Sequence, residues 1–181
     1  IHEVQNAYEA YERVFSMDPY RVEDFLEAHR LLTHGLVKYP GQFRLRDVGV
    51  YDASGRVVHI GARPQFVPSL VEELFSWAKN SDLLDLVKSC LVHFELEMIH
   101  PFEDGNGRME RLWQNVILAN WNPLFSWIPI ETIIYENQRA RRLNLRPFSS
   151  QFKTALSSLV ELVDNTMIRE VAKYMKILEK N

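Results

Sequence analysis

The residues best suited to chemistry lie in one segment, 100–111, which reads HPFEDGNGRMER. The backbone can turn sharply at Gly105-Asn106-Gly107, because glycine adopts conformations that a Cβ atom would hinder. We predict that a helix begins at this turn, so that several backbone N–H groups converge on one point. Such a turn is a cradle for an anion such as phosphate.

Charged side chains surround this turn. Arg108 and Arg111 are three residues apart, so on a helix they project to one side and can bind neighbouring phosphates through paired hydrogen bonds. Asp104 can supply a carboxylate oxygen to a Mg²⁺ ion that also binds phosphate oxygens. Histidine titrates near neutral pH, so His100 can take a proton from a hydroxyl group. Together these residues predict a site for a nucleotide phosphate with a general base beside it.

Helices must position this segment, because apolar residues recur at helical spacing through most of the chain. The spacing predicts helices at 4–15, 25–36, 71–78, 83–98, 108–120, 130–141, 148–163 and 165–180. The broad apolar stripe over 83–98 indicates a central, heavily buried helix. We expect Ser81-Asp82 to cap this helix, and Pro101 to end it at His100, because proline disfavours helical geometry in the residue before it.

One short β-hairpin interrupts the helical pattern. The turn-rich segment 52–55 lies between strand-forming residues on both sides. These residues are Val48, Val50, Val57, Val58 and Ile60. We therefore predict an all-α fold with one small hairpin, in a single domain over residues 1–181.

Composition and charge exclude several classes of protein. The 181 residues include 21 Lys and Arg and 24 Asp and Glu, which gives a net charge of −3. This balance argues against a protein that neutralises many nucleic-acid phosphates at once. The single cysteine, Cys90, cannot form an internal disulfide, and no apolar run is long enough to cross a membrane. We expect a cytoplasmic protein with neither nucleic acid nor membrane as a partner.

The segment 100–111 resembles the signature of the Fic-domain family, His-x-Phe-x-(Asp/Glu)-Gly-Asn-Gly-Arg-x-x-Arg. Weaker family motifs are found at 3–7, 41–44 and 128–132. The resemblance covers a core of about 3–152, which would leave 153–181 as C-terminal helices. It implies the Fic-type helical bundle with a β-hairpin flap.

Carried over position by position, the resemblance implies AMP transfer from ATP to a Ser, Thr or Tyr hydroxyl of a protein target. His100 would deprotonate the hydroxyl, Asp104 would bind Mg²⁺, and Phe102 would be an apolar anchor for the loop. The nucleotide phosphates would be bound by Gly105, Asn106, Gly107, Arg108 and Arg111. The flap, which would align the target by strand addition, would consist of Val57, Val58, His59, Ile60 and Gly61.

The resemblance also implies regulation by an inhibitory helix, (Ser/Thr)-x-x-x-Glu-(Gly/Asn), whose Glu pairs with the arginine that matches Arg111. The one match in this sequence, 132–137, coincides with a core family motif. We therefore expect the helix to precede Ile1 or to come from another chain, and a homodimer is possible. Relatives commonly have paired tyrosines and a longer loop after Gln138, so the shorter stretch 139–148 leaves the contacts to adenine open.

Other interpretations of these residues remain. His93, Glu97 and His100 would lie on one side of a helix and could bind zinc, although no further strong ligand is evident. The arginines in 139–146 could contact nucleic acid, but such a run is usually a solvated face. Cys90 lies on an apolar stripe, which favours a structural thiol. Transfer of another nucleotide, removal of AMP, and a catalytically silent nucleotide-binding module are alternative functions, and the intact base and carboxylate argue against the last.

Overall fold

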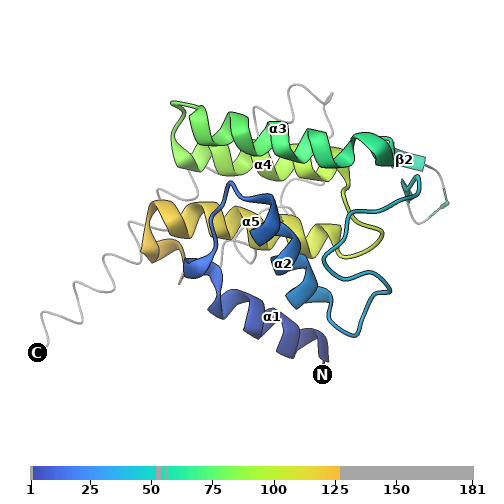
Figure 1. Cartoon of the computed structure of the whole chain (residues 1–181), viewed down its shortest axis with the longest axis horizontal. Coiled ribbons are helices and arrows are strands. Elements are labelled where there is room, and N and C mark those ends of the chain that lie inside the picture. Colours follow the sequence, from blue (N-terminus) through green and yellow to red (C-terminus); the bar gives the residue numbers. More distant parts are fainter. Residues whose placement is uncertain (1, 52–53, 56, 127–181) are drawn as a thin grey trace, which may run out of the picture. The chain divides into compact units, whose positions relative to one another are not determined.

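Helices dominate residues 2–51, 54–55 and 57–126, the part of the chain that the computed structural model describes (Figure 1). These residues belong to a unit that spans Ile1–Ile128. In chain order the α-helices, 3₁₀ helices (η) and strands are α1 (His2–Glu12), η1 (Val14–Ser16), α2 (Val22–Thr33), β1 (Gly49–Tyr51), β2 (Val57–Ile60), η2 (Pro64–Phe66), α3 (Val67–Asn80), α4 (Asp85–Ile99), α5 (Asn106–Trp121) and η3 (Pro123–Ser126). The predicted all-α fold with one hairpin is therefore confirmed.

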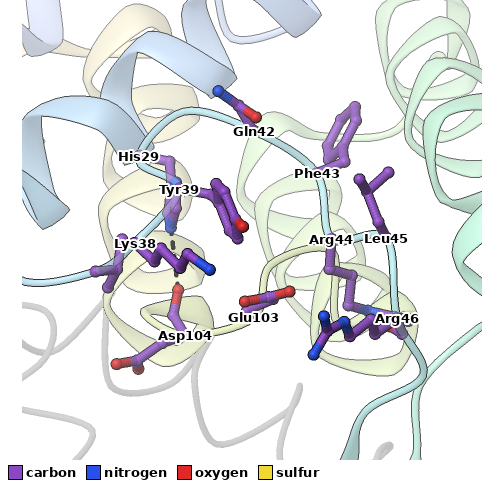
Figure 2. Close-up of a pocket in the computed structure, with 11 residues that line it drawn as sticks. His29, Lys38, Tyr39, Gln42, Phe43, Arg44, Leu45, Arg46, Glu103 and Asp104 are labelled. Atoms are coloured by element: carbon purple, nitrogen blue, oxygen red, sulfur yellow. Dashed lines mark hydrogen bonds between the residues drawn. The ribbon is translucent and has the colours of Figure 1, made fainter.

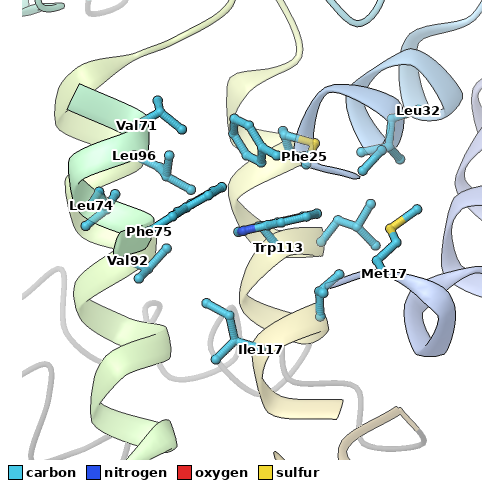
Figure 3. Packing of buried hydrophobic residues seen from close by; sticks show 14 of the residues in the cluster. Met17, Phe25, Leu32, Val71, Leu74, Phe75, Val92, Leu96, Trp113 and Ile117 are labelled. Carbon is cyan, nitrogen blue, oxygen red and sulfur yellow. The ribbon is translucent and has the colours of Figure 1, made fainter. Parts of the chain in front are cut away.

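The central helix is α5, which runs between the α3–α4 pair and the α1–α2 pair (Figure 1). Its Trp113 is fully buried and packs against Phe75 of α3 and Phe25 of α2, with ring centroids 5.7 and 5.1 Å apart (Figure 3). The indole Nε1 donates a hydrogen bond to the carbonyl of Pro19 at 3.1 Å. Aromatic side chains from three helices thus form the core around the middle of α5.

The helix predicted over 83–98 is present as α4, but it is not the most buried helix. Its buried apolar face includes Leu86, Val92 and Leu96, whereas Cys90 is half-buried and Leu83 is exposed. The apolar stripe over 83–98 is therefore wider than the face that the structure buries. The reason is that α4 packs mainly between α3 and α5, and only part of its circumference faces them.

The predicted cap of α4 is wrong. Leu84 occupies the N-cap position of α4 and makes no capping hydrogen bond through its side chain. The Ser81 hydroxyl instead accepts the N–H of Leu83 at 3.3 Å, within a short loop that precedes the helix. The predicted end of α4 is confirmed, because the helix ends at Ile99 and His100 has a left-handed backbone.

Helix α1 is present as predicted, but its apolar stripe is not its buried face. Val4 and Tyr8 are 75% and 65% exposed, whereas Asn6 and Ala10 are buried. The Asn6 amide donates a hydrogen bond to the carbonyl of His34 at 2.8 Å. Contact with α2 through a small residue and a hydrogen-bonding residue sets the orientation of α1, and this contact outweighs the apolar pattern.

The hairpin joins β1 and β2 in antiparallel register, with Gly49 opposite Ile60 and Val50 opposite His59. A register irregularity follows Val50. None of the described helices has the length and apolarity that a membrane span requires.

Several predictions fall on residues outside the described part of the chain. These are the helices over 130–141, 148–163 and 165–180, the family motif at 128–132, the match at 132–137, and the stretch 139–148 with its arginines. The single domain over 1–181 accordingly stays a prediction.

Candidate active site

The loop between α4 and α5 is closed by Asn106, the first residue of α5. Its amide accepts the N–H of Phe102 at 2.9 Å and donates to the carbonyl of the same residue at 2.8 Å. The Asn106 side chain is buried, so it fixes the loop, and its backbone N–H is the group left to contact an anion.

His29 of α2 supports the same loop through its ring. The ring of His29 stacks on Phe102 with centroids 3.7 Å apart and planes 2° from parallel. Its Nδ1 accepts the N–H of Gly41 at 2.9 Å, so the proton is on Nε2, which donates to the carbonyl of Asp104 at 3.0 Å (Figure 2). Burial lowers the pKa of His29 and keeps the ring neutral.

Gly105 makes the sharp turn into α5. It has a φ of +85°, and a Cβ atom there would lie 2.8 Å from Cγ2 of Thr33. The N–H of Met109 bonds back to Gly105 at 2.9 Å, so the N–H groups before it, in the first turn of α5, have no acceptor within the helix. The predicted cradle consists of Gly105, Asn106 and Gly107, but the Gly105 N–H donates to Oδ1 of Asp104 at 2.5 Å. The donors at the helix start are therefore the N–H groups of Asn106, Gly107 and Arg108.

Both predicted arginines flank the start of α5. Arg108 lies 3.9 Å from the Asp104 carboxylate and forms an ion pair with Glu3 of α1, with Nη1 2.9 Å from Oε1. A Cβ atom on Gly107 would lie 3.3 Å from Nη1 of Arg111. The structure therefore brings together the cradle, two guanidinium groups and one carboxylate, and it adds Glu3, for which the sequence motif gave no role.

His100 lies at the opposite end of the loop. Its ring is half-buried, and Nδ1 is buried without a hydrogen-bond partner in the described part of the chain. Burial lowers the pKa of His100, and the nearby Arg44 and His59 lower it further, against the opposing effect of the Glu97 backbone. The imidazole is therefore neutral at pH 7 and able to accept a proton.

The predicted flap lies directly against His100. His59 of β2 is hydrogen-bonded through Nε2 to the carbonyl of Met98 at 2.7 Å. A Cβ atom on Gly61 would lie 3.1 Å from Cβ of His100. Val57 and Ile60 are 53% and 68% exposed, so the flap presents apolar side chains to solvent.

A cavity of about 390 Å³ lies beside the loop, between residues 37–46 and Glu103 and Asp104 (Figure 2). The Asp104 side chain is 70% exposed, so it can reach a cation together with substrate oxygens. Within residues 2–126 as described, no group of three or more His, Cys, Asp or Glu side chains is arranged to hold a metal.

Sequence reasoning assigned no role to two residues that organise this site, His29 and Arg44. His29 lies within the helix predicted over 25–36, and its signal in the sequence is a titratable residue at an apolar position of the helical pattern. For Arg44, the only indication of a role in the sequence is that it belongs to the family motif at 41–44, which lies outside the segment 100–111.

Comparison with known proteins identifies relatives. The family model described as Fic/DOC family matches residues 19–118. Protein adenylyltransferase fic-1 of Caenorhabditis elegans is 30% identical over 139 residues, which are 72% of this chain and 26% of that protein. Protein adenylyltransferase Fic of Aedes aegypti is 36% identical over 134 residues, 70% of this chain and 26% of that protein.

Solved structures are also similar. The crystal structure of a Fic family protein from Desulfovibrio desulfuricans G20 has a TM-score of 0.79 and 38% identity, and the match covers 93% of this chain and 53% of that one. The chain therefore spans about a quarter of the length of these two adenylyltransferases and about half of this bacterial structure.

Proposed function

The chain belongs to the Fic/DOC family, and on that premise we propose that it transfers AMP from ATP to a Ser, Thr or Tyr hydroxyl of a protein. The observation that carries the proposal is the loop between α4 and α5. It has a neutral, half-buried imidazole at one end, and at the other the N–H groups of a helix start, which have no acceptor within the helix, with two arginines.

In the proposed reaction, Nε2 of His100 takes the proton of the target hydroxyl. The hydroxyl oxygen then forms a bond to the α-phosphorus of ATP, and the bond from that phosphorus to the bridging oxygen breaks. AMP remains on the target, and pyrophosphate leaves. The site contributes by positioning the reactants and by preorganised positive charge, the two effects that dominate such transfers.

The phosphates would be bound at the start of α5. The N–H groups of Asn106 and Gly107 are assigned to the α- and β-phosphates, and Arg108 and Arg111 to the β- and γ-phosphates. Arg108 would exchange its ion pair with Glu3 for the phosphate, because Glu3 is 65% exposed and a surface ion pair contributes only about 0–1 kcal/mol.

Asp104 fits a Mg²⁺ ion that accompanies ATP. Its exposed carboxylate stands at the mouth of the cradle, and Mg²⁺ in such sites uses one or two carboxylates together with substrate phosphates. The ion would offset the negative charge of the leaving group. The carbonyl bond to His29 keeps the residue that carries this carboxylate in place.

The flap would bind the target. An extended segment can pair with the edge of a two-stranded hairpin through its backbone, and the apolar side chains of Val57 and Ile60 are exposed for additional contacts. Because Gly61 packs on Cβ of His100, a hydroxyl carried by that segment would be brought to the base.

The test is incubation of the protein with Mg²⁺, lysate protein and ATP labelled at either the α- or the γ-phosphate. We expect label on protein from the α position only. His100→Ala should lower the transfer at least about 100-fold, the lower range for loss of a general base. His34→Ala, which changes an exposed histidine, is the matched control and should match the wild type.

Label from the γ position would contradict AMP transfer and indicate transfer of a phosphate. Undiminished transfer by His100→Ala would contradict the assignment of the base. Equal loss in both histidine variants would point to a general effect on the fold.

A further inference from the structure

Arg44 is the most unusual charged residue beside the site, because its guanidinium group is buried. The residue is 2% exposed, and its side chain donates only to backbone carbonyls among its recorded hydrogen bonds. The acceptors are His100 at 2.6 Å, Arg46 at 2.7 Å, Ile99 at 3.2 Å, and Ala62. Burying a charged group costs free energy unless the group is fully hydrogen-bonded. Packing alone therefore does not explain why a guanidinium group occupies this buried position.

Two of these acceptors are the backbone carbonyls directly before and after the Cα atom of His100, the proposed general base. The carbonyls of Ile99 and His100 flank the backbone of His100, whose φ of 54° is the one positive value among the described non-glycine residues. A left-handed backbone at a residue with a side chain persists only where its surroundings enforce it. The N–H of Arg44 adds a third bond, to the carbonyl of Pro101 at 3.0 Å.

The other acceptors lie in the two arms of the hairpin. Arg46 precedes β1 and Ala62 follows β2. The N–H of Ala62 also bonds to the carbonyl of Ile99 at 3.2 Å. One guanidinium group therefore joins both arms of the flap to the backbone on both sides of the base.

We propose that Arg44 is a positioning residue that couples the target-binding flap to His100, so that a hydroxyl held on the flap meets the base at a fixed distance. This inference rests on the proposed AMP transfer. None of the recorded Arg44 bonds reaches the start of α5, so ATP binding should not depend on it. A displacement of about 1 Å between reacting groups can lower a rate by about 100-fold.

Arg44→Lys is the variant of choice, because it keeps the buried charge but cannot reproduce the planar fork of donors. Arg30→Lys is the matched control, since Arg30 lies on α2 and pairs with Glu27 at a partly exposed position. The measurements are α-labelled AMP transfer to total lysate protein at saturating Mg-ATP, the Kd of Mg-ATP, and amide hydrogen exchange of the flap.

For Arg44→Lys we expect transfer to fall about 100-fold and the Kd of Mg-ATP to stay within about twofold of the wild type. The amides of Gly61 and Ala62, which are hydrogen-bonded to Val48 and Ile99, should exchange at least about tenfold faster, since a lost contact of 1.4 kcal/mol is a factor of ten. Arg30→Lys should leave all three quantities unchanged.

Wild-type transfer or unchanged flap exchange in Arg44→Lys would overturn the proposal. A parallel loss of transfer and of ATP affinity would also overturn it, because it would show that the substitution disturbs the whole site and not the flap alone. If the wild type itself transfers no label, the proposed function fails, and the exchange measurement still decides whether Arg44 holds the flap to the backbone of His100.

Discussion

The surroundings of His100 favour the neutral state of its imidazole ring. Its left-handed backbone directs the chain out of α4, and its ring is half-buried with Nδ1 enclosed. Burial disfavours the charged imidazolium, and the nearby positive groups act in the same direction. An imidazole in such surroundings is neutral at pH 7, which is the state that the proposed base requires.

We therefore predict an acidic limb in the pH profile of AMP transfer that belongs to His100. Because the pKa is lowered, kcat/KM should stay high as the pH falls below about 6.5, the ordinary histidine value, and should decline only at lower pH as the imidazole gains a proton. Steady-state rates between pH 4.5 and 8 measure this limb. An apparent pKa at or above the ordinary value would contradict the lowered pKa of the base.

Glu110 is a second perturbed residue, within the segment 100–111 but without a predicted role. It is 5% exposed, and its Oε1 has no hydrogen-bond partner in the described part of the chain. Burial raises its pKa from 4.5 to about 7, and the charge of Glu97 acts in the same direction, whereas Arg111 opposes the shift. The folded protein therefore binds this proton more tightly than the unfolded chain does.

The Glu110 contribution to stability is fully present below pH 4.5 and is lost as the pH rises to about 7. One pKa unit corresponds to about 1.4 kcal/mol, so the loss is roughly 3 kcal/mol. We predict that Glu110→Gln removes this dependence and is more stable than the wild type at pH 8. Urea unfolding at pH 5 and pH 8 measures it, with the exposed Glu95→Gln as control. A pH dependence that persists in Glu110→Gln would contradict the assignment.

At the scale of elements, the sequence predicted the ends of helices correctly where a residue acts on the backbone next to it. Pro101 ended α4 at the expected place because proline restricts the backbone of the residue before it, and Gly105 preceded a helix as predicted because glycine can adopt the left-handed backbone of the turn. The roles of His29 and Arg44 depend on partners 75 and 56 residues away, Asp104 and His100. No local pattern contains such a contact, so the support of the loop by α2 and by the flap could not be predicted.

The contact between α2 and the loop predicts the behaviour of His29→Phe. Phenylalanine keeps the stack on Phe102 but leaves the N–H of Gly41 and the carbonyl of Asp104 without partners, at about 1–3 kcal/mol for each buried group. We expect a lower unfolding temperature and a several-fold higher Mg²⁺ concentration for half-maximal transfer. The control is His34→Phe at an exposed position. An unchanged Mg²⁺ requirement would show that His29 does not position Asp104.

For the whole molecule, the fold class was predictable and the arrangement of helices was not. Helical spacing identified the helices of residues 2–126, but it placed α4 at the centre, where α5 is found with the buried Trp113. Spacing reports which residues are apolar and not which helix they will face. The packing of α5 between two helix pairs brings its first turn to the loop, and so determines where the anion-binding groups stand.

If the proposed function holds, that arrangement separates the nucleotide-binding groups from the base, and the stability of the protein with and without ligand can report the difference. A ligand that binds only the folded protein stabilises it by about 2.7 kcal/mol at 100 times its Kd, so Mg-ATP should raise the unfolding temperature of the wild type. His100→Ala should retain the full increase, because the base is at the other end of the loop from the phosphate-binding groups. Arg108→Ala and Arg111→Ala should lose most of it, measured at equal Mg-ATP against their own ligand-free proteins. An increase that depends on His100 but not on the arginines would place the nucleotide elsewhere than at the start of α5.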